Sequence, residues 1–118
     1  MKYIVAIIRP ERFEAVQAAL FARDVHLMTV SDVRGCGTQK AEADHFRGNT
    51  VGMVRLLPKV KLEIAVNEAY VQPTVDAILA AARSGPGGRV GDGKVFVLQL
   101  DEVFRVRTGE TGSVAIGP

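Results

Sequence analysis

The segment Lys59–Val66, KVKLEIAV, has the clearest secondary-structure pattern in this sequence. Polar Lys59, Lys61 and Glu63 alternate with apolar residues, which is the period of a strand with one buried face. The apolar positions of this alternation are Val60, Leu62, Ile64 and Val66. A sheet built from such strands needs other elements packed against its apolar face, so the sequence on either side fixes the fold class.

Strand and helix patterns alternate on both sides of this stretch. A first helix opens at Pro10, where the missing N–H costs no hydrogen bond, and stops near Asp24. A second helix covers Glu68–Arg83, with its regular part beginning near Gln72 because Pro73 is tolerated only in a first turn. The other expected strands are Tyr3–Ile8, His26–Gly35, Lys94–Leu100 and a short fifth, Val103–Arg107. The order β-α-β-β-α-β predicts an α+β, ferredoxin-like fold: an antiparallel sheet with both helices on one face.

Two segments are longer than such a fold requires. Cys36–Pro58 separates two strands by roughly 20 residues, where a hairpin uses about 2–5, so a functional or disordered loop is expected. Ser84–Lys94, SGPGGRVGDGK, is rich in glycine and directly precedes a strand. We therefore expect one domain over 1–118, with a long loop at about 37–58, a glycine-rich loop at about 84–94 and a tail over 103–118.

Composition and charge argue against several classes of protein. The net charge is +2 with mixed signs, which is not the footprint of a nucleic-acid-binding protein. No apolar run approaches the ~18 residues of a membrane span, and the N-terminus predicts a strand, not a signal peptide, so a cytosolic location is expected. Cys36, the single cysteine, cannot form an internal disulfide, and we expect its thiol to be buried or half-buried.

Two clusters could bind anions, and the residues alone leave each with an alternative. Gly91-Asp92-Gly93-Lys94 could form an anion-binding turn of main-chain amides, or it is a hairpin turn. Arg105 and Arg107 lie two apart on the expected last strand, so they share a face and could clamp phosphates, or they mark a solvated edge strand. Lys59 could pair with a ligand carboxylate, or it belongs to a surface stripe.

Catalytic patterns are poor in this sequence. His26 and His45 are the only histidines, and no nucleophile–base motif or pair of carboxylates is recognisable, so we expect no enzyme. A metal site made by Cys36, Asp44 and His45 is an alternative, and a slow ATPase on the same fold is another.

Seven segments, spread over nearly the whole chain, are informative together. They are Ala6–Pro10, Met28–Val30, Gly35–Lys40, Phe46–Gly48, Leu57–Glu63, Gly91–Val97 and Arg105–Glu110. In their joint order and spacing, these segments resemble the P-II nitrogen-regulatory signal-transduction family.

The resemblance implies a homotrimer with nucleotide sites in the clefts between subunits. Members of this family bind ATP or ADP, and many bind 2-oxoglutarate beside Mg-ATP. The long loop is the family's T-loop, which partners such as ammonium transporters and nitrogen-metabolism enzymes or regulators contact. The glycine-rich loop is the phosphate-binding B-loop. A cytoplasmic regulator, recruited to the membrane when its partner is a transporter, is therefore expected.

The same resemblance assigns roles to residues of this chain. Arg105 and Arg107 approach the phosphates from a neighbouring subunit, Gln39 helps to hold Mg²⁺ and 2-oxoglutarate, and Lys59 pairs with the distal carboxylate of the oxoacid. The nucleotide-binding set is Thr29, Gly35, Gly37, Thr38, Gln39, Glu63, Val66, Gly91, Asp92, Gly93, Lys94, Arg105 and Arg107. The partner-binding set is His45, Phe46, Arg47 and Gly48, with Arg47 matching the arginine that enters a transporter's pore in relatives.

Four positions depart from the family pattern. Thr38 stands where the family usually has an arginine, and the B-loop carries extra residues within Pro86–Val90. Val51 stands near the tyrosine that many relatives modify with a nucleotide, and Asn49 stands where some carry a phosphorylated serine. These departures favour a divergent member, and the alternative is a P-II-like sensor of a different adenine nucleotide or anion.

Overall fold

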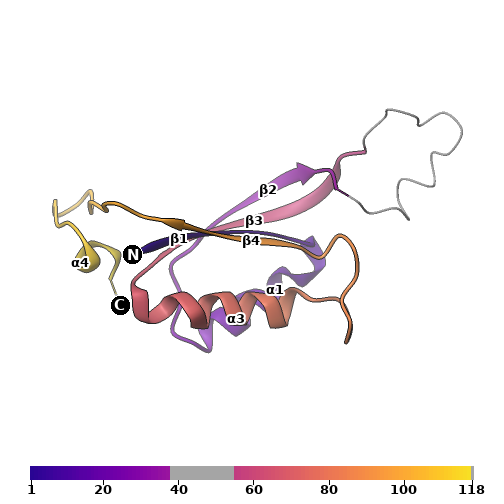
Figure 1. Ribbon diagram of the computed structural model, residues 1–118. Helices are drawn as coiled ribbons and strands as arrows, with labels where there is room; N and C mark the ends of the chain where they lie inside the picture. Colours follow the sequence, from indigo (N-terminus) through magenta and orange to yellow (C-terminus); the bar gives the residue numbers. More distant parts are fainter. Residues whose placement is uncertain (38–54, 118) are drawn as a thin grey trace, which may run out of the picture.

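The computed structural model describes residues 1–37 and 55–117, which build a four-stranded antiparallel sheet with both long helices on one face (Figure 1). The strands are β1 (Lys2–Ile8), β2 (Thr29–Gly35), β3 (Leu57–Val66) and β4 (Gly93–Gln99). Their spatial order is β2-β3-β1-β4, with β3 between β2 and β1. This arrangement confirms the predicted α+β, ferredoxin-like fold.

The two long helices each follow a short 3₁₀ turn. The turn η1 (Pro10–Arg12) leads into α1 (Phe13–Phe21), and η2 (Glu68–Tyr70) leads into α3 (Val71–Ala82). Pro73 lies in the first turn of α3, where its missing N–H removes no helical hydrogen bond. The expected position of both prolines is therefore confirmed.

The core lies between the helices and one face of the sheet. Alternate residues of β1 and β3 are almost fully buried there, as the period of two requires. The largest of the buried side chains are Ile4, Ile8, Val16, Leu20, Leu62, Ile64 and Ile78. The opposite face of the sheet carries Tyr3, Val5 and Ile7, and no described element covers it (Figure 1).

The predicted fifth strand is wrong. Val103–Arg107 forms no strand; a single bridge joins Phe104 to Thr111. The carbonyl of Arg105 accepts a hydrogen bond from the N–H of Gly109 at 2.7 Å, so the chain turns back on itself. The premise that two arginines share one face of a strand therefore fails.

The remaining tail packs beside the start of α3. The tail includes a one-turn helix, α4 (Ser113–Ile116). Asn67 Nδ2 donates hydrogen bonds to the carbonyls of Ser113 and Gly117, at 3.2 and 3.0 Å, which fixes the tail against the end of β3.

A smaller difference from the prediction concerns the chain between α1 and β2. β2 begins at Thr29 instead of His26, because the chain leaves α1 through a turn in which Asp24 has φ 61°. Of the helices that the structure describes, none has the length and apolar character needed to cross a bilayer.

Candidate functional site

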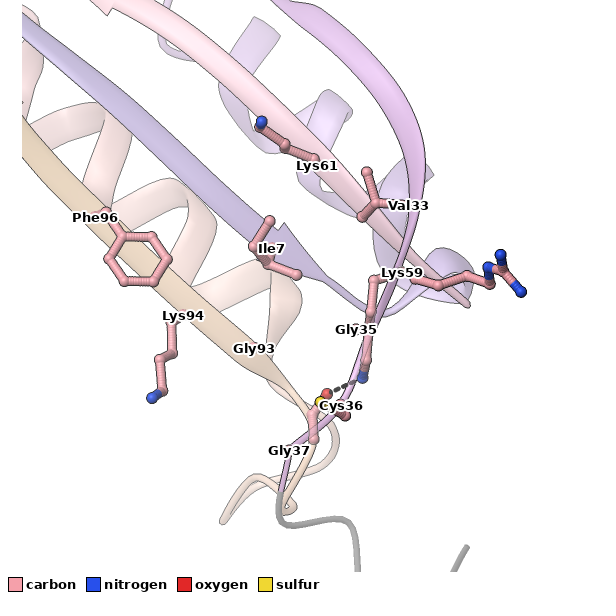
Figure 2. A pocket seen from close by; sticks show the side chains of 12 residues that line it. Ile7, Val33, Gly35, Cys36, Gly37, Lys59, Lys61, Gly93, Lys94 and Phe96 are labelled. Carbon is pink, nitrogen blue, oxygen red and sulfur yellow. Dashed lines mark hydrogen bonds between the residues drawn. The ribbon is translucent and has the colours of Figure 1, made fainter. Parts of the chain in front are cut away.

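A cavity of about 590 Å³ opens where β1 and β2 end and β3 and β4 begin (Figure 2). Among the residues that the structure describes, four of those lining the cavity are cationic and none is acidic. Its lining consists of Ile7, Val33, Arg34, Gly35, Cys36, Gly37, Lys59, Lys61, Gly91, Gly93, Lys94 and Phe96. The residues on both sides of the long loop and the end of the glycine-rich loop thus meet at one place.

Strand register places the lysines on a common face. Ile7 lies opposite both Lys61 on β3 and Lys94 on β4, and Val33 lies opposite Lys59. Directly opposed residues of antiparallel strands point to the same side of the sheet. The three ammonium groups therefore belong to the face that the helices leave uncovered.

Lys59 is the most enclosed of these cations. Only 9% of the residue is exposed, and its Nζ donates a 2.7 Å hydrogen bond to the carbonyl of Gly91 (Figure 2). This bond ties the start of β3 to the glycine-rich loop. Lys61 Nζ lies 3.6 Å from Glu63 Oε1, whereas Lys94 is exposed and forms no ion pair among the described residues.

Glycine is required where β4 begins. Gly93 has φ +108°, and a Cβ at this position would lie 1.7 Å from the carbonyl oxygen of Ile7. Gly91 has φ +100°, a conformation that residues with side chains rarely adopt. The turn containing them joins α3 to β4, so the alternative of a hairpin between two strands is wrong.

Asp92 is directed into its own loop. Its carboxylate accepts hydrogen bonds from the main chain and hydroxyl of Ser84, the main-chain N–H of Arg89 and the guanidinium of Arg9. Burial acts to raise the pKa of this carboxyl, but the hydrogen bonds from Ser84, Arg89 and Arg9 outweigh it and hold the pKa well below its usual range. Asp92 does not line the cavity, and the role in nucleotide binding that the resemblance implies for it remains a prediction.

Comparison with known proteins identifies the family. The family described as nitrogen regulatory protein P-II matches residues 1–110. The chain belongs to the P-II family. It is 47% identical over 116 residues to the nitrogen regulatory protein GlnK1 of Methanosarcina mazei, covering 98% of this chain and 97% of the relative. It is 44% identical over 116 residues to the P-II protein of Synechocystis, covering 98% and 100%.

A solved P-II structure has the same fold. The crystal structure of Arabidopsis thaliana PII bound to citrate matches with a TM-score of 0.75 and 37% identity, covering 98% of this chain and 88% of that one. The relatives named above are regulatory proteins, which fits the expectation that this P-II protein is a regulator and not an enzyme.

The structure brings part of the expected nucleotide-binding set together. Five members line the cavity beside Lys59: Gly35, Gly37, Gly91, Gly93 and Lys94. Thr29 and Glu63 are opposed residues of β2 and β3 that line a second cavity of about 380 Å³. At about 3.3 Å per residue, Thr29 lies roughly 20 Å along β2 from Gly35. Within one chain, the expected set is therefore divided between two places.

Glu63 in the second cavity is held by Tyr3. The Tyr3 hydroxyl donates a hydrogen bond to Glu63 Oε2, and this bond, followed by burial and the nearby negative charge, raises the pKa of the phenol. Ala65 lines the same cavity, whereas Val66 is 5% exposed and lies in the core beneath the helices. The Val66 side chain therefore points to the other face of the sheet, and the expected contact of this residue with a ligand remains a prediction.

The two tail arginines, Arg105 and Arg107, follow the end of β4 at Gln99, whereas the first cavity lies at its beginning, beside Gly93. Figure 1 shows the tail and the B-loop at opposite ends of the sheet. Arg105 Nη1 lies 2.5 Å from Glu110 Oε1, and Nη2 donates to the carbonyl of Val114 at 2.7 Å. Arg107 is exposed and makes no ion pair within residues 1–37 and 55–117. One chain does not bring these guanidinium groups to its own B-loop.

Several expected site residues fall outside the described part of the chain. They are Thr38, Gln39, His45, Phe46, Arg47 and Gly48. Asp44 of the alternative metal site falls there too, and the residues that the structure does describe contain no group of three metal-binding side chains. Cys36 is exposed in the cavity wall, which corrects the expectation of a buried or half-buried thiol.

Sequence reasoning missed two arginines of this region. Arg34 lines the cavity from β2, and Arg9 is 9% exposed behind the B-loop. An arginine at a strand end is usually solvated, so composition and spacing held no signal for the burial of Arg9. Its position before Pro10, at the exit from β1, was the only local hint of a structural role.

Proposed function

We propose that this P-II protein is a signal-transduction regulator that binds an adenine nucleotide, ATP or ADP, in the cationic cavity. The observation that carries the proposal is the lining itself, which in the described part of the chain has four cations, no carboxylate, and main chain from Gly35, Gly37, Gly91 and Gly93. Glycines allow close approach of a phosphate to the main chain, and lysines supply charge-assisted hydrogen bonds. The cavity volume lies within the range of about 300–1,000 Å³ that small-molecule sites occupy.

The proposal includes a homotrimer with the sites at subunit boundaries. The uncovered face of the sheet exposes Phe96 and Leu98 at 48% each, beside Val5 and Ile7. Contiguous apolar surface of this kind is typical of a protein interface. A neighbouring subunit would also supply the tail arginine Arg107, whose guanidinium has no acidic partner among the described residues.

We further propose 2-oxoglutarate as a co-ligand with Mg-ATP. The enclosed ammonium of Lys59 is suited to a carboxylate, and Gln39 would hold Mg²⁺ together with the phosphates. To bind the oxoacid, Lys59 would exchange its hydrogen bond to the Gly91 carbonyl for one to the ligand. Because Gly91 belongs to the B-loop and Lys59 follows the T-loop, that exchange would connect the two loops.

The readout in this proposal is the T-loop. Gly35, Cys36 and Gly37 at its start line the cavity, so a ligand there contacts the base of the loop directly. Partner contacts are assigned to His45–Gly48, and the partner is an ammonium-type transporter or a protein of nitrogen metabolism. A cytoplasmic location, with recruitment to the membrane by a transporter, follows from this role.

The single cysteine provides a direct test of the site. Cys36 is exposed in the cavity wall, so an occupied cavity shields its thiol. We expect saturating ATP or ADP to slow the alkylation of Cys36 by N-ethylmaleimide at least about tenfold. The reason is that, with about nine-tenths of the sites occupied, only about one-tenth of the thiols can react at any time. Intact mass spectrometry follows the reaction, and titration calorimetry on the same sample measures binding.

A relocated thiol serves as the control. In a Cys36→Ser, Glu14→Cys double variant the thiol lies on an exposed position of α1, and nucleotide should leave its alkylation rate unchanged. Calorimetric binding without protection of Cys36 would place the nucleotide elsewhere. No calorimetric binding of ATP, ADP or AMP would reject the nucleotide altogether, and a panel of other adenine nucleotides and anions would then examine the alternative that Thr38 and the longer B-loop favour.

A further inference from the structure

One enclosed arginine holds the B-loop from behind. The Arg9 side chain is 11% exposed, its Nε lies 2.9 Å from Asp92 Oδ1, and its Nη2 donates to the carbonyl of Val90 at 2.8 Å. Arg9 follows β1 directly, and β1 lies between β3 and β4 in the sheet. The guanidinium thus links the rigid core to two positions of the loop.

Asp92 gathers the rest of the loop at the same point. Its Oδ2 accepts hydrogen bonds from the N–H groups of Ser84 and Arg89, both at 2.9 Å, and its Oδ1 accepts one from the Ser84 hydroxyl at 2.6 Å. Residues from the beginning, middle and end of the loop therefore meet at one carboxylate. Residues 84–94 contain five glycines, so without these bonds the loop would have many accessible conformations.

We propose that Arg9 and Asp92 are positioning residues that hold the B-loop in its phosphate-binding form before any ligand arrives. The inference rests on the proposed function, because it assigns the loop's fixed form to phosphate binding. Neither residue lines the cavity, so both act through the main chain of Gly91 and Gly93 in front of them. A loop that is already ordered loses less conformational entropy on binding, which raises affinity.

Arg12 offers a matched comparison three positions further along the chain. Its Nε and Nη2 both donate to the carbonyl of Ala81, at 2.9 and 2.6 Å. It therefore joins η1 to the end of α3 in the way that Arg9 joins the end of β1 to the B-loop. The hydrogen bonds of Arg12 go to the helix and not to residues 84–94, so its loss should weaken the fold without releasing the loop.

The experiment compares Arg9→Met with Arg12→Met, because methionine keeps much of the apolar stem of arginine. The first measurement is amide hydrogen exchange over residues 84–93 in the ligand-free protein. The second is calorimetric affinity for ATP and for adenosine. For Arg9→Met we expect faster exchange in the B-loop and about tenfold weaker ATP binding, since only a fraction of loops would be competent, with adenosine binding unchanged. For Arg12→Met we expect wild-type exchange in the loop and wild-type affinity for both ligands.

A conservative series separates positioning from overall stability. Arg9→Lys keeps one cationic donor and should recover part of the ATP affinity, whereas Asp92→Asn should behave like Arg9→Met. These two variants also decide the question if Arg9→Met does not fold. Equal losses of ATP affinity in Arg9→Met and Arg12→Met, or equal losses for ATP and adenosine, would overturn the proposal.

The ligand-free measurement keeps this inference distinct from the proposed function. Unchanged exchange in Arg9→Met would overturn the clamp even if ATP binds tightly. A wild-type protein that binds no nucleotide, while Arg9→Met still exchanges faster, would instead reject the phosphate-binding role and leave the clamp as a purely structural device.

Discussion

Alanine at Gly93 should be among the most damaging single substitutions in this chain. A Cβ there would lie 1.7 Å from the carbonyl oxygen of Ile7 and 2.8 Å from its carbon. Relief of that overlap requires β4 to move from β1 by more than an ångström at the Ile8–Gly93 pair, which breaks hydrogen bonds worth about 1 kcal/mol each. The φ of +108° adds about 1–2 kcal/mol for any residue with a side chain. Together these predict a loss of about 3–5 kcal/mol in the free energy of unfolding.

Two glycines of the same loop separate the causes. Gly85 has φ +69° and open space where a Cβ would lie, so Gly85→Ala should cost only the backbone strain, about 1 kcal/mol. Gly87 has open space and no positive φ, so Gly87→Ala should be neutral or stabilise by about 0.4–1 kcal/mol. Urea unfolding at one fixed protein concentration measures the free energy of unfolding of the Gly85→Ala, Gly87→Ala and Gly93→Ala variants. A Gly93→Ala loss no larger than that of Gly85→Ala would refute the close approach of β4 to Ile7.

Two further predictions concern buried polar groups. Thr74 is fully buried on α3 and its hydroxyl has no hydrogen-bond partner among the described residues, so Thr74→Val should stabilise the protein by about 1 kcal/mol in urea unfolding; a loss of that size would show that the hydroxyl is bonded. The pKa of Asp92 is lowered by folding, so its stabilising contribution is complete well above the ordinary value of 3.8 and decreases as the pH falls toward the folded-state pKa. The stability difference between wild type and Asp92→Asn should therefore be constant near neutral pH and shrink in acid; a difference that grows in acid would contradict the assigned direction.

Local patterns were sufficient to predict most of the fold. The alternation of Lys59–Val66 fixes which side chains face the helices, and the observed burial follows it residue by residue from Val60 onward. Pro10 and Pro73 mark first turns because a residue without an N–H is harmless only there. These signals depend only on residues within the same strand or helix, so packing against other elements did not alter the predicted structure.

The tail shows where a local pattern is insufficient. Val103–Arg107 alternates like a strand, but a strand needs a partner, and the sheet ends at β4 on that side. Gly109 and Gly112 take positive φ values, and the chain reverses onto itself at the Phe104–Thr111 bridge. The face to which a strand residue points is equally hard to predict from a local pattern. Because side chains alternate along a strand, an error of one position replaces Ala65, which lines the second cavity, with Val66, which lies in the core.

The direction of Asp92 has the largest consequence for the site. From sequence, Gly91-Asp92-Gly93-Lys94 combines one anion with one cation, and nothing local determines which of them faces a ligand. A carboxylate about 4 Å from a phosphate would oppose binding by about 4 kcal/mol at an effective dielectric constant of about 20, or roughly a thousandfold in affinity. The structure avoids this repulsion because Arg9 and Ser84 draw the carboxylate behind the loop, while Lys94 remains in the cavity lining. In the proposed site, the sign of the charge that faces a bound anion would therefore depend on a buried arginine that does not line the cavity.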